Sequence, residues 1–120
     1  MLNRTVEKAE DIADAVNGYF NRECVVPMHM DDYKSLKESG YIVIQTTSVG
    51  LYPNVNDTVI EDKEFYKKVK AGVDIIYNPS TTKFMELCME AGKPAFNGLK
   101  MLLYQGVAAY EPVSYTHLRA

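Results

Sequence analysis

Cysteine and histidine are scarce in this sequence, with two residues of each type in 120. Cys24 and Cys88 are far apart and form no Cys-x-x-Cys motif, and only His29 and His117 add possible nitrogen ligands. We therefore expect no metal site. Both cysteines are expected to be reduced and to pack as small apolar groups.

Long apolar runs and an excess of positive charge are also missing. No run approaches the roughly 20 residues that cross a bilayer, and Met1–Arg4 lacks the apolar segment of a secretory signal. The formal net charge is -3, with both signs interspersed and no basic stripe. These absences predict a cytoplasmic protein that binds neither nucleic acid nor membranes, and they leave the oligomeric state open.

What is present is ordinary for a globular protein. Hydrophobic residues make up 47% of the chain and charged residues 24%, and the length suits one domain with one core. The first expected elements are a helix capped by Thr5 that ends near Gly18, a short buried run at Cys24–Val26, and a short helix capped by Asp31 or Asp32.

The run Tyr41–Gln45 is almost continuously apolar and β-branched. Continuous rather than alternating apolarity indicates a parallel strand that is covered on both faces. The following residues, Thr46–Asp57, include Gly50, Pro53 and several hydroxyl or amide side chains, so we expect a long ordered loop there. Loops at the carboxyl end of a parallel strand are where α/β sheets bind ligands.

The rest of the chain continues to alternate between helix and strand. In order, the pattern predicts a helix over Glu61–Lys70 broken by Gly72, a buried strand over Val73–Tyr77, a helix from Thr81 or Thr82 to Gly92, and an edge strand at Pro94–Phe96. Alternation from end to end predicts an α/β fold with a parallel sheet and right-handed crossovers.

The stretch Asn97–Gly106 joins a turn dipeptide, Asn-Gly, to a helix. One helical stripe is expected to be buried and consists of Leu99, Leu102, Leu103, Gly106 and Ala109. The adjoining stripe, Met101, Gln105 and Ala108, is available to a ligand, and Gly98 allows close approach to a bound ring. The alternative is a core helix that begins at a glycine and carries one polar residue at its edge.

Asn3, Arg4 and Thr5 stand between the end of a short strand, Met1–Leu2, and a helix start. An arginine there can bind a phosphate together with Lys8 one turn later and the free N–H groups of the helix. In dinucleotide-binding folds this position meets the adenosine ribose, where a cation favours NADP over NAD. The alternative is a solvated surface pair with no specific role.

Together these segments resemble shikimate dehydrogenase from Met1 to about Glu111. The matching landmarks are Asn3-Arg4-Thr5 with Lys8, Gln45 to Gly50, Asp74 to Pro79 with Thr82, and Asn97-Gly98-Leu99 with Met101-Leu102 and Gln105-Gly106. The resemblance implies reversible reduction of 3-dehydroshikimate to shikimate with NADPH, on the way to aromatic amino acids. Gln45 departs from the family, which usually has Asn there, so bracing of the following loop is in doubt.

The resemblance also implies roles for individual residues. For NADP they are Asn3, Arg4, Thr5 and Lys8 at the 2'-phosphate, Thr47 and Ser48 on the loop, and Ile75, Gly98 and Met101 around the nicotinamide. For the small-molecule substrate, shikimate or 3-dehydroshikimate, they are Tyr77 and Gln105. Without the resemblance, each of these residues has a plain structural explanation as a turn former, strand end or solvated helix residue.

Parts of the family pattern are missing from the sequence. Nothing corresponds to the amino-terminal domain that supplies the catalytic Lys and Asp, and the seven glycines make no Gly-x-Gly-x-x-Gly turn. We therefore expect a fragment without catalytic residues: an incomplete Rossmann-like parallel sheet flanked by helices, over residues 1–111, that lacks its first strand. Residues 112–120 do not continue the family pattern, and Ser114–Ala120 resemble a translated sequencing adapter. We therefore expect a non-native tail over residues 112–120 and give His117 no role.

The missing first strand has a predicted structural consequence. In the 3-2-1-4-5-6 strand order of this fold, strand 1 is central, so its loss should separate strand 3 from strands 4, 5 and 6. We expect such a chain to be inactive and poorly folded alone. A quinate/shikimate dehydrogenase fragment and a non-catalytic α/β nucleotide-binding module are the alternative functions.

Overall fold

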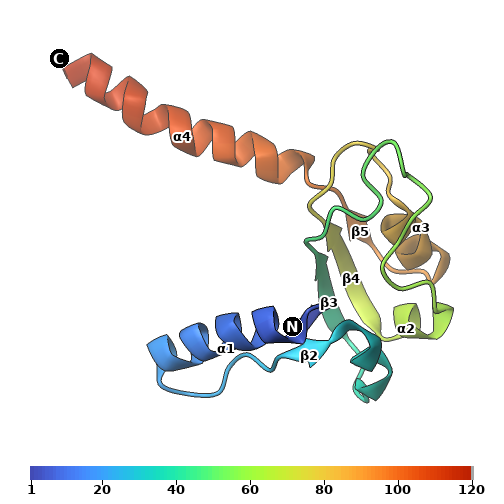
Figure 1. The fold of residues 1–120 in the computed structure, drawn as a ribbon. Helices are drawn as coiled ribbons and strands as arrows, with labels where there is room; N and C mark the ends of the chain where they lie inside the picture. Colours follow the sequence, from blue (N-terminus) through green and yellow to red (C-terminus); the bar gives the residue numbers. More distant parts are fainter. Residues whose placement is uncertain (120) are drawn as a thin grey trace. The chain divides into compact units, whose positions relative to one another are not determined.

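The computed structural model describes residues 1–119, and it describes side chains for residues 1–110. The side chains of the expected tail, residues 112–120, lie outside this range. The chain divides into two compact units, Met1–Glu38 and Ser39–Ala120, and each is described by itself. Figure 1 labels the elements along the chain.

The first unit is a strand–helix–strand arrangement followed by one short 3-10 helix. Strand β1 (Leu2–Asn3) pairs in parallel with β2 (Met28–His29), and α1 (Val6–Phe20) connects them. The predicted first strand is present but lies one residue later, at Leu2–Asn3 rather than Met1–Leu2. The cap position at Thr5 is confirmed, although the Thr5 side chain makes no capping hydrogen bond.

Helix α1 continues past Gly18, so the predicted stop there is wrong. It ends at Asn21, whose left-handed backbone (φ 52°) lets its N–H reach the last carbonyl groups of the helix. Ala9 and Ala13 are its buried residues. No heavy atom lies within 4 Å of a Cβ built at Gly18, so nothing there requires a glycine.

The segment before β2 differs from the predicted buried run at Cys24–Val26. Cys24 and Val26 are exposed, and the strand begins only after Pro27. The side-chain amide of Asn17 holds this segment: its Oδ1 accepts from the N–H groups of Cys24 and Val25, both at 2.8 Å, and its Nδ2 donates to the Val25 carbonyl at 2.9 Å. Because a side chain satisfies this backbone, no neighbouring strand is needed.

The 3-10 helix η1 (Met30–Ser35) follows β2 directly. Its cap is His29, whose Nδ1 accepts from the Asp31 N–H at 3.1 Å, so the prediction of an aspartate cap is wrong. A ring nitrogen two residues upstream supplies the acceptor that we expected from a carboxylate.

The second unit contains a parallel sheet in the order β3-β4-β5. The strands are β3 (Tyr41–Gln45), β4 (Val69–Asp74) and β5 (Ala95–Phe96), and the helices are α2 (Lys63–Lys67), α3 (Lys83–Glu90) and α4 (Leu99–Arg119). The register pairs Gln45 with Asp74. The α/β parallel arrangement and the edge position of β5 are confirmed. The separation of these strands from β1 and β2 stays a prediction.

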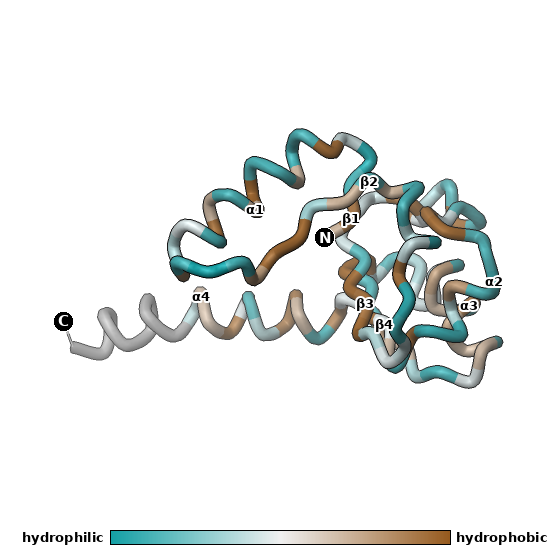
Figure 2. Tube along the Cα trace, turned by 90° about the horizontal axis from the view of Figure 1, so that it is seen from below, coloured by the Kyte–Doolittle hydropathy of each residue, from teal (hydrophilic) through white to brown (hydrophobic). Residues whose placement is uncertain are grey.

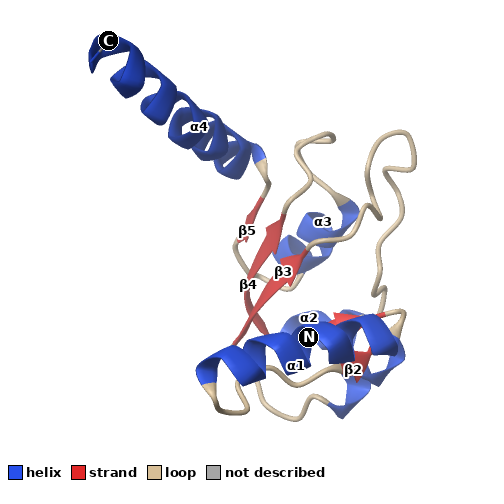
Figure 3. Cartoon of the chain, turned by 60° about the vertical axis from the view of Figure 1, so that its left-hand side comes forward, coloured by secondary structure: helices blue, strands red, loops and turns tan. Residues whose placement is uncertain are grey.

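Strand β4 begins at Val69, four residues before the predicted start, and Gly72 lies inside it rather than at a helix end. A Cβ at Gly72 would lie 2.6 Å from the Cys88 sulfur and 3.0 Å from the Phe84 ring. Gly72 therefore allows α3 to pack closely on the sheet (Figure 3). Cys88 is buried, as expected, and burial, together with the nearby Asp74 charge, raises its pKa to about 11.

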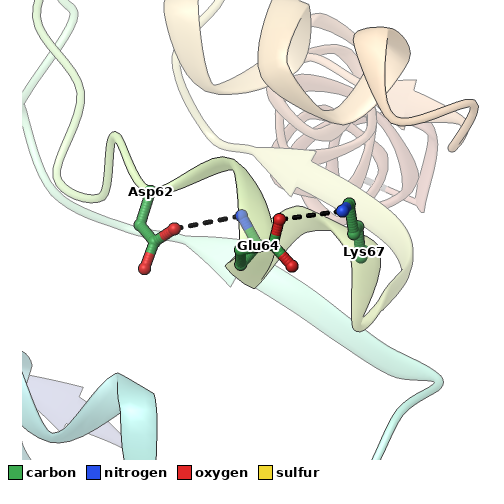
Figure 4. Close-up of polar contacts among 3 residues, drawn as sticks. All are labelled: Asp62, Glu64 and Lys67. Carbon is green, nitrogen blue, oxygen red and sulfur yellow. Dashed lines mark hydrogen bonds and ion pairs between the residues drawn. The ribbon is translucent and has the colours of Figure 1, made fainter.

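Helix α2 is shorter than the predicted Glu61–Lys70. Asp62 caps it by accepting from the Glu64 N–H at 3.0 Å, and Glu64 pairs with Lys67 at 2.8 Å (Figure 4). The Tyr66 hydroxyl donates to the Ile60 carbonyl at 2.5 Å, and burial raises its pKa to about 12. These contacts attach the end of the long loop to the core.

Two predicted buried surfaces are exposed. Ile42 and Ile44 of β3 are 65% and 61% exposed, so this hydrophobic strand (Figure 2) is not covered on both faces. On α4 the expected buried leucines are exposed as well: Leu99, Leu102 and Leu103. The core of this unit lies where α2 and α3 contribute Phe65, Tyr66, Phe84 and Leu87, and no described element buries the other two surfaces.

The described part of the chain has no helix with the length and apolar character needed to cross a membrane.

Candidate functional site

Three loops meet at the carboxyl ends of β3, β4 and β5, where open parallel sheets hold ligands. Main-chain hydrogen bonds join them: the Tyr52 N–H donates to Asn78 O at 3.2 Å, and the Gly98 N–H donates to Ile76 O at 3.0 Å. The Asn97 amide also donates to the Ser80 carbonyl at 2.9 Å. We call this connected edge, residues 45–57, 74–82 and 97–105, the loop cluster.

Gln45 ends β3 and is 8% exposed. Its Oε1 accepts from the N–H of Thr47 and from the Thr47 hydroxyl, the latter at 2.6 Å, and its Nε2 donates to the Val49 carbonyl at 3.1 Å. The bracing of this loop, which the sequence left in doubt, is therefore present with a glutamine.

Thr47 and Ser48 lie in the first turn of this loop, but their hydroxyl groups are in different situations. The Thr47 hydroxyl is half-buried, donates to Gln45 and accepts from the Val49 N–H at 3.2 Å. Ser48 is exposed. Thr47 thus shapes the loop, as its structural interpretation holds, while Ser48 presents a hydroxyl to solvent.

Asp74 ends β4 beside Gln45 and is fully buried, at 0% exposure. Its Oδ1 accepts from the Ile76 N–H at 3.0 Å, and its Oδ2 accepts from the Thr82 hydroxyl at 2.8 Å. The Gln45 Nε2 lies 3.5 Å from the same Oδ2. One carboxylate therefore touches the ends of two strands and the start of α3, because the Thr82 oxygen also caps that helix.

No role was predicted for Asp74, although the sequence carries a signal. An acidic residue inside the apolar run Val73–Tyr77 must find donors when it is buried. Thr82, expected as a possible helix start, is the donor eight residues later. Residue patterns alone do not give that pairing, since it depends on how the loop between the two residues turns.

Gly98 and Ile75, both expected near one ring, are in contact with each other. A Cβ at Gly98 would lie 1.8 Å from the Ile75 carbonyl oxygen and 2.4 Å from its carbon. The absence of a side chain is thus required by the chain itself at this point. Asn97 then starts α4, since its Oδ1 accepts from the Leu99 N–H at 3.1 Å.

Tyr77, Met101 and Gln105 are exposed side chains of the loop cluster. Tyr77 follows the end of β4, while Met101 and Gln105 are four residues apart on α4 and share one face of that helix. Because residues 99–110 of α4 are all exposed, exposure does not distinguish this face from the stripe that was predicted to be buried.

The four remaining site candidates lie in the first unit. The Asn3 amide donates to the Thr5 carbonyl at 3.0 Å, so Asn3 shapes the turn before α1. Arg4, Thr5 and Lys8 are exposed. Neither cation takes part in an ion pair among the residues whose side chains are described. Arg4, just before α1, and Lys8, in its first turn, thus present two uncommitted positive charges.

Within that same described part, no group of three or more His, Cys, Asp or Glu side chains is arranged to hold a metal ion.

Comparison with known proteins finds similarity to NADP-dependent shikimate dehydrogenases. No family model matches it. It is 38% identical over 111 residues to the shikimate dehydrogenase (NADP(+)) of Methanococcus aeolicus, and the match covers 92% of this chain and 39% of the relative. The chain therefore spans about two fifths of that relative, and it matches the relative's carboxyl-terminal part.

Solved structures give the same result. A shikimate dehydrogenase in complex with NADP+ superposes with a TM-score of 0.79 at 31% identity, over 92% of this chain and 38% of that one. The shikimate 5-dehydrogenase of Listeria monocytogenes, in complex with shikimate and NAD, gives 0.77 at 27% identity, over 92% and 40%. The Rossmann-like fold class is thereby confirmed.

Proposed function

Because this chain corresponds to the carboxyl-terminal part of shikimate dehydrogenases, we propose that it is the NADP-binding part of an enzyme that reduces 3-dehydroshikimate to shikimate with NADPH. The observation that carries the proposal is the match over 92% of the chain to an NADP-dependent relative. The chain covers only 39% of that relative, so the activity belongs to the chain together with the sequence that completes the enzyme.

The proposed 2'-phosphate site consists of Asn3, Arg4, Thr5 and Lys8. Arg4 supplies a planar set of donors, and Lys8 adds a second charge one helical turn away. Both are exposed and uncommitted in the described part of the chain, and the positive end of α1 favours the same anion. This donor set fits NADP better than NAD.

The proposed nicotinamide site belongs to the loop cluster. Ile75 and Gly98 are packed together at its centre, Met101 is exposed beside them on α4, and Thr47 and Ser48 approach from the loop after β3. NADPH, when bound, supplies the hydride. The residues of this chain fix the orientation of the ring and shield one of its faces.

The proposed substrate contacts are Tyr77 and Gln105, which carry exposed polar groups on the same cluster. They bind and orient oxygen atoms of shikimate or 3-dehydroshikimate. No catalytic residue is assigned in this chain, since the Lys and Asp expected for proton transfer are not among the matched landmarks. The chain alone is therefore inactive in this proposal. We place the enzyme in the cytoplasm, and cell fractionation would test that location.

The quinate/shikimate dehydrogenase and the non-catalytic module are not favoured, because the relatives are named as shikimate dehydrogenases. The module would still bind the nucleotide but would carry no chemistry. A test of activity therefore separates it from the enzyme.

A hybrid enzyme provides that test. In it, the matched 111 residues of the Methanococcus aeolicus enzyme are replaced by the corresponding residues of this chain. We expect the hybrid to oxidise shikimate with NADP+ and to restore growth without aromatic amino acids in a bacterium that lacks its own enzyme. The amino-terminal part of the relative, expressed alone, is the control without activity.

A monodisperse hybrid with a cooperative melt and no activity above that control would overturn the proposal. If the fused chains do not fold, the same two parts are co-expressed as separate polypeptides and the same assays are applied. Preference for quinate over shikimate in either format would instead support the first alternative.

A further inference from the structure

We propose that Asp74 and Gln45 form a buried positioning pair that holds two sides of the dinucleotide site in the binding conformation before the cofactor arrives. The inference rests on the proposed function. It adds two residues to which neither the sequence nor the comparisons give a role in binding.

The pair connects the two strand ends from which the site is built. Gln45 fixes the turn that contains Thr47 and Ser48 through the Thr47 N–H, the Thr47 hydroxyl and the Val49 carbonyl. Asp74 accepts from the Ile76 N–H at 3.0 Å, which fixes the backbone directly after β4. The 3.5 Å approach between Gln45 Nε2 and Asp74 Oδ2 joins these two sets of contacts.

The second set of contacts continues to α4. Ile76, whose N–H binds Asp74, accepts from the Gly98 N–H at 3.0 Å through its own carbonyl. Gly98 packs on Ile75 and precedes the helix that carries Met101. Asp74 is thus connected through Ile76 to Gly98, in the proposed nicotinamide site. Gln45 binds Thr47 and Val49, the two neighbours of Ser48 in the chain.

The donors and acceptors of the two side chains all face partners, so replacing a single atom of either side chain should disturb the pair. Gln45 Oε1 faces two donors and Nε2 faces two acceptors, so the amide has one favourable orientation. Asp74→Asn places an NH2 group where Oδ2 stands, opposite either the Gln45 NH2 or the Ile76 N–H if the new amide turns. Gln45→Glu instead places two carboxylates about 3.5 Å apart.

Each single variant should therefore disturb the loop while the double variant restores a donor–acceptor match. In Asp74→Asn/Gln45→Glu, the new amide at position 74 donates to one oxygen of the new carboxylate at position 45. The other oxygen of that carboxylate still accepts from Thr47. The hydrogen bond to the Val49 carbonyl stays lost, as it is in Gln45→Glu, because a carboxylate oxygen cannot donate to it. The number of buried charges is unchanged. This exchange distinguishes a specific pair from a general loss of stability.

The first measurement is the Kd for NADP+ of the hybrid enzyme at mildly alkaline pH. We expect each single variant to raise this Kd roughly tenfold, since a buried polar group is left without a suitable partner. The double variant should raise the Kd by clearly less than the product of the two single increases. Tyr66→Phe is the matched control, because it also removes a buried hydrogen bond, at Ile60. It should lower the melting temperature and leave the Kd within about twofold.

The second measurement is hydrogen exchange of residues 46–50 in the hybrid without cofactor. The single variants should exchange faster there than the parent or Tyr66→Phe, and the double variant should exchange more slowly than Gln45→Glu. Equal Kd values for parent and single variants, additive losses in the double variant, or an equal loss in Tyr66→Phe would overturn the inference. Because exchange needs no ligand, it decides on the pair even if the hybrid fails to bind NADP+, a result that counts only against the proposed function.

Discussion

Gly98→Ala is the sharpest test of how the loop cluster is assembled. Gly98 has no unusual backbone angle, so the whole effect comes from the methyl group, which would lie 1.8 Å from the Ile75 carbonyl oxygen. The two backbones must separate by roughly 1.2 Å before that contact reaches the 3.0 Å limit of real Cβ contacts. A separation of that size also breaks the 3.0 Å hydrogen bond between the Gly98 N–H and the Ile76 carbonyl.

The expected cost follows from these two losses. Overpacking of this kind costs about 1 to 3 kcal/mol, and the lost hydrogen bond adds about 1 kcal/mol. The free energy of unfolding of the hybrid enzyme should therefore fall by roughly 2 to 4 kcal/mol, and its melting temperature by at least about 4 °C. We would measure both by thermal and urea unfolding, followed by circular dichroism.

Gly106→Ala is the matched control, because it makes the same substitution where no heavy atom lies within 4 Å of the new Cβ. Inside a helix this exchange should stabilise by about 0.5 to 1 kcal/mol. The two variants should thus change stability in opposite directions. Equal effects would refute the claim that the contact with Ile75 requires a glycine at position 98.

Three further predictions concern the hybrid enzyme and the chain alone. Arg4→Ala should raise the KM for NADPH roughly tenfold, through loss of a charge-assisted hydrogen bond, and leave the KM for NADH nearly unchanged; equal losses with both cofactors in steady-state assays would reject the phosphate role. Gln105→Ala should raise the KM for shikimate and leave that for NADP+ unchanged, and an effect confined to NADP+ would reject the assignment to substrate. The chain alone, with Ile42 and Ile44 exposed, should associate through its unpaired strand edge and apolar surface and show no dehydrogenase activity; a monodisperse sample in analytical ultracentrifugation would contradict this.

The pattern of the sequence predicts the second unit well where local signals are strong. Continuous β-branched residues give β3 with its observed bounds, and Thr82 with Gly92 brackets α3 correctly. The start of β4 was predicted four residues too late, because Gly72 indicates a helix end when only local propensity is considered. Its true reason, close packing against Cys88, becomes visible only when α3 lies on the sheet.

Burial was harder to predict than secondary structure. The apolar runs of β3 and α4 indicate surfaces that are designed to be covered, but a pattern does not tell which element covers them. Here the side chains of Ile42, Ile44 and Leu103 are exposed. The same limit applies to the candidate site. Asp74 gains one partner, Gln45, from another strand and a second, Thr82, only through the way the intervening loop turns.

A small change of backbone direction at Gly98 is amplified along α4, the helix that follows it. Gln105 is six residues beyond Leu99, or about 9 Å along the helix axis. If α4 tilts by about 10° at Gly98, Gln105 is displaced by roughly 1.6 Å. A misplacement of about 1 Å can reduce a rate by roughly two orders of magnitude. The absence of a side chain at Gly98 thereby affects the position of Gln105, about two helical turns further along α4.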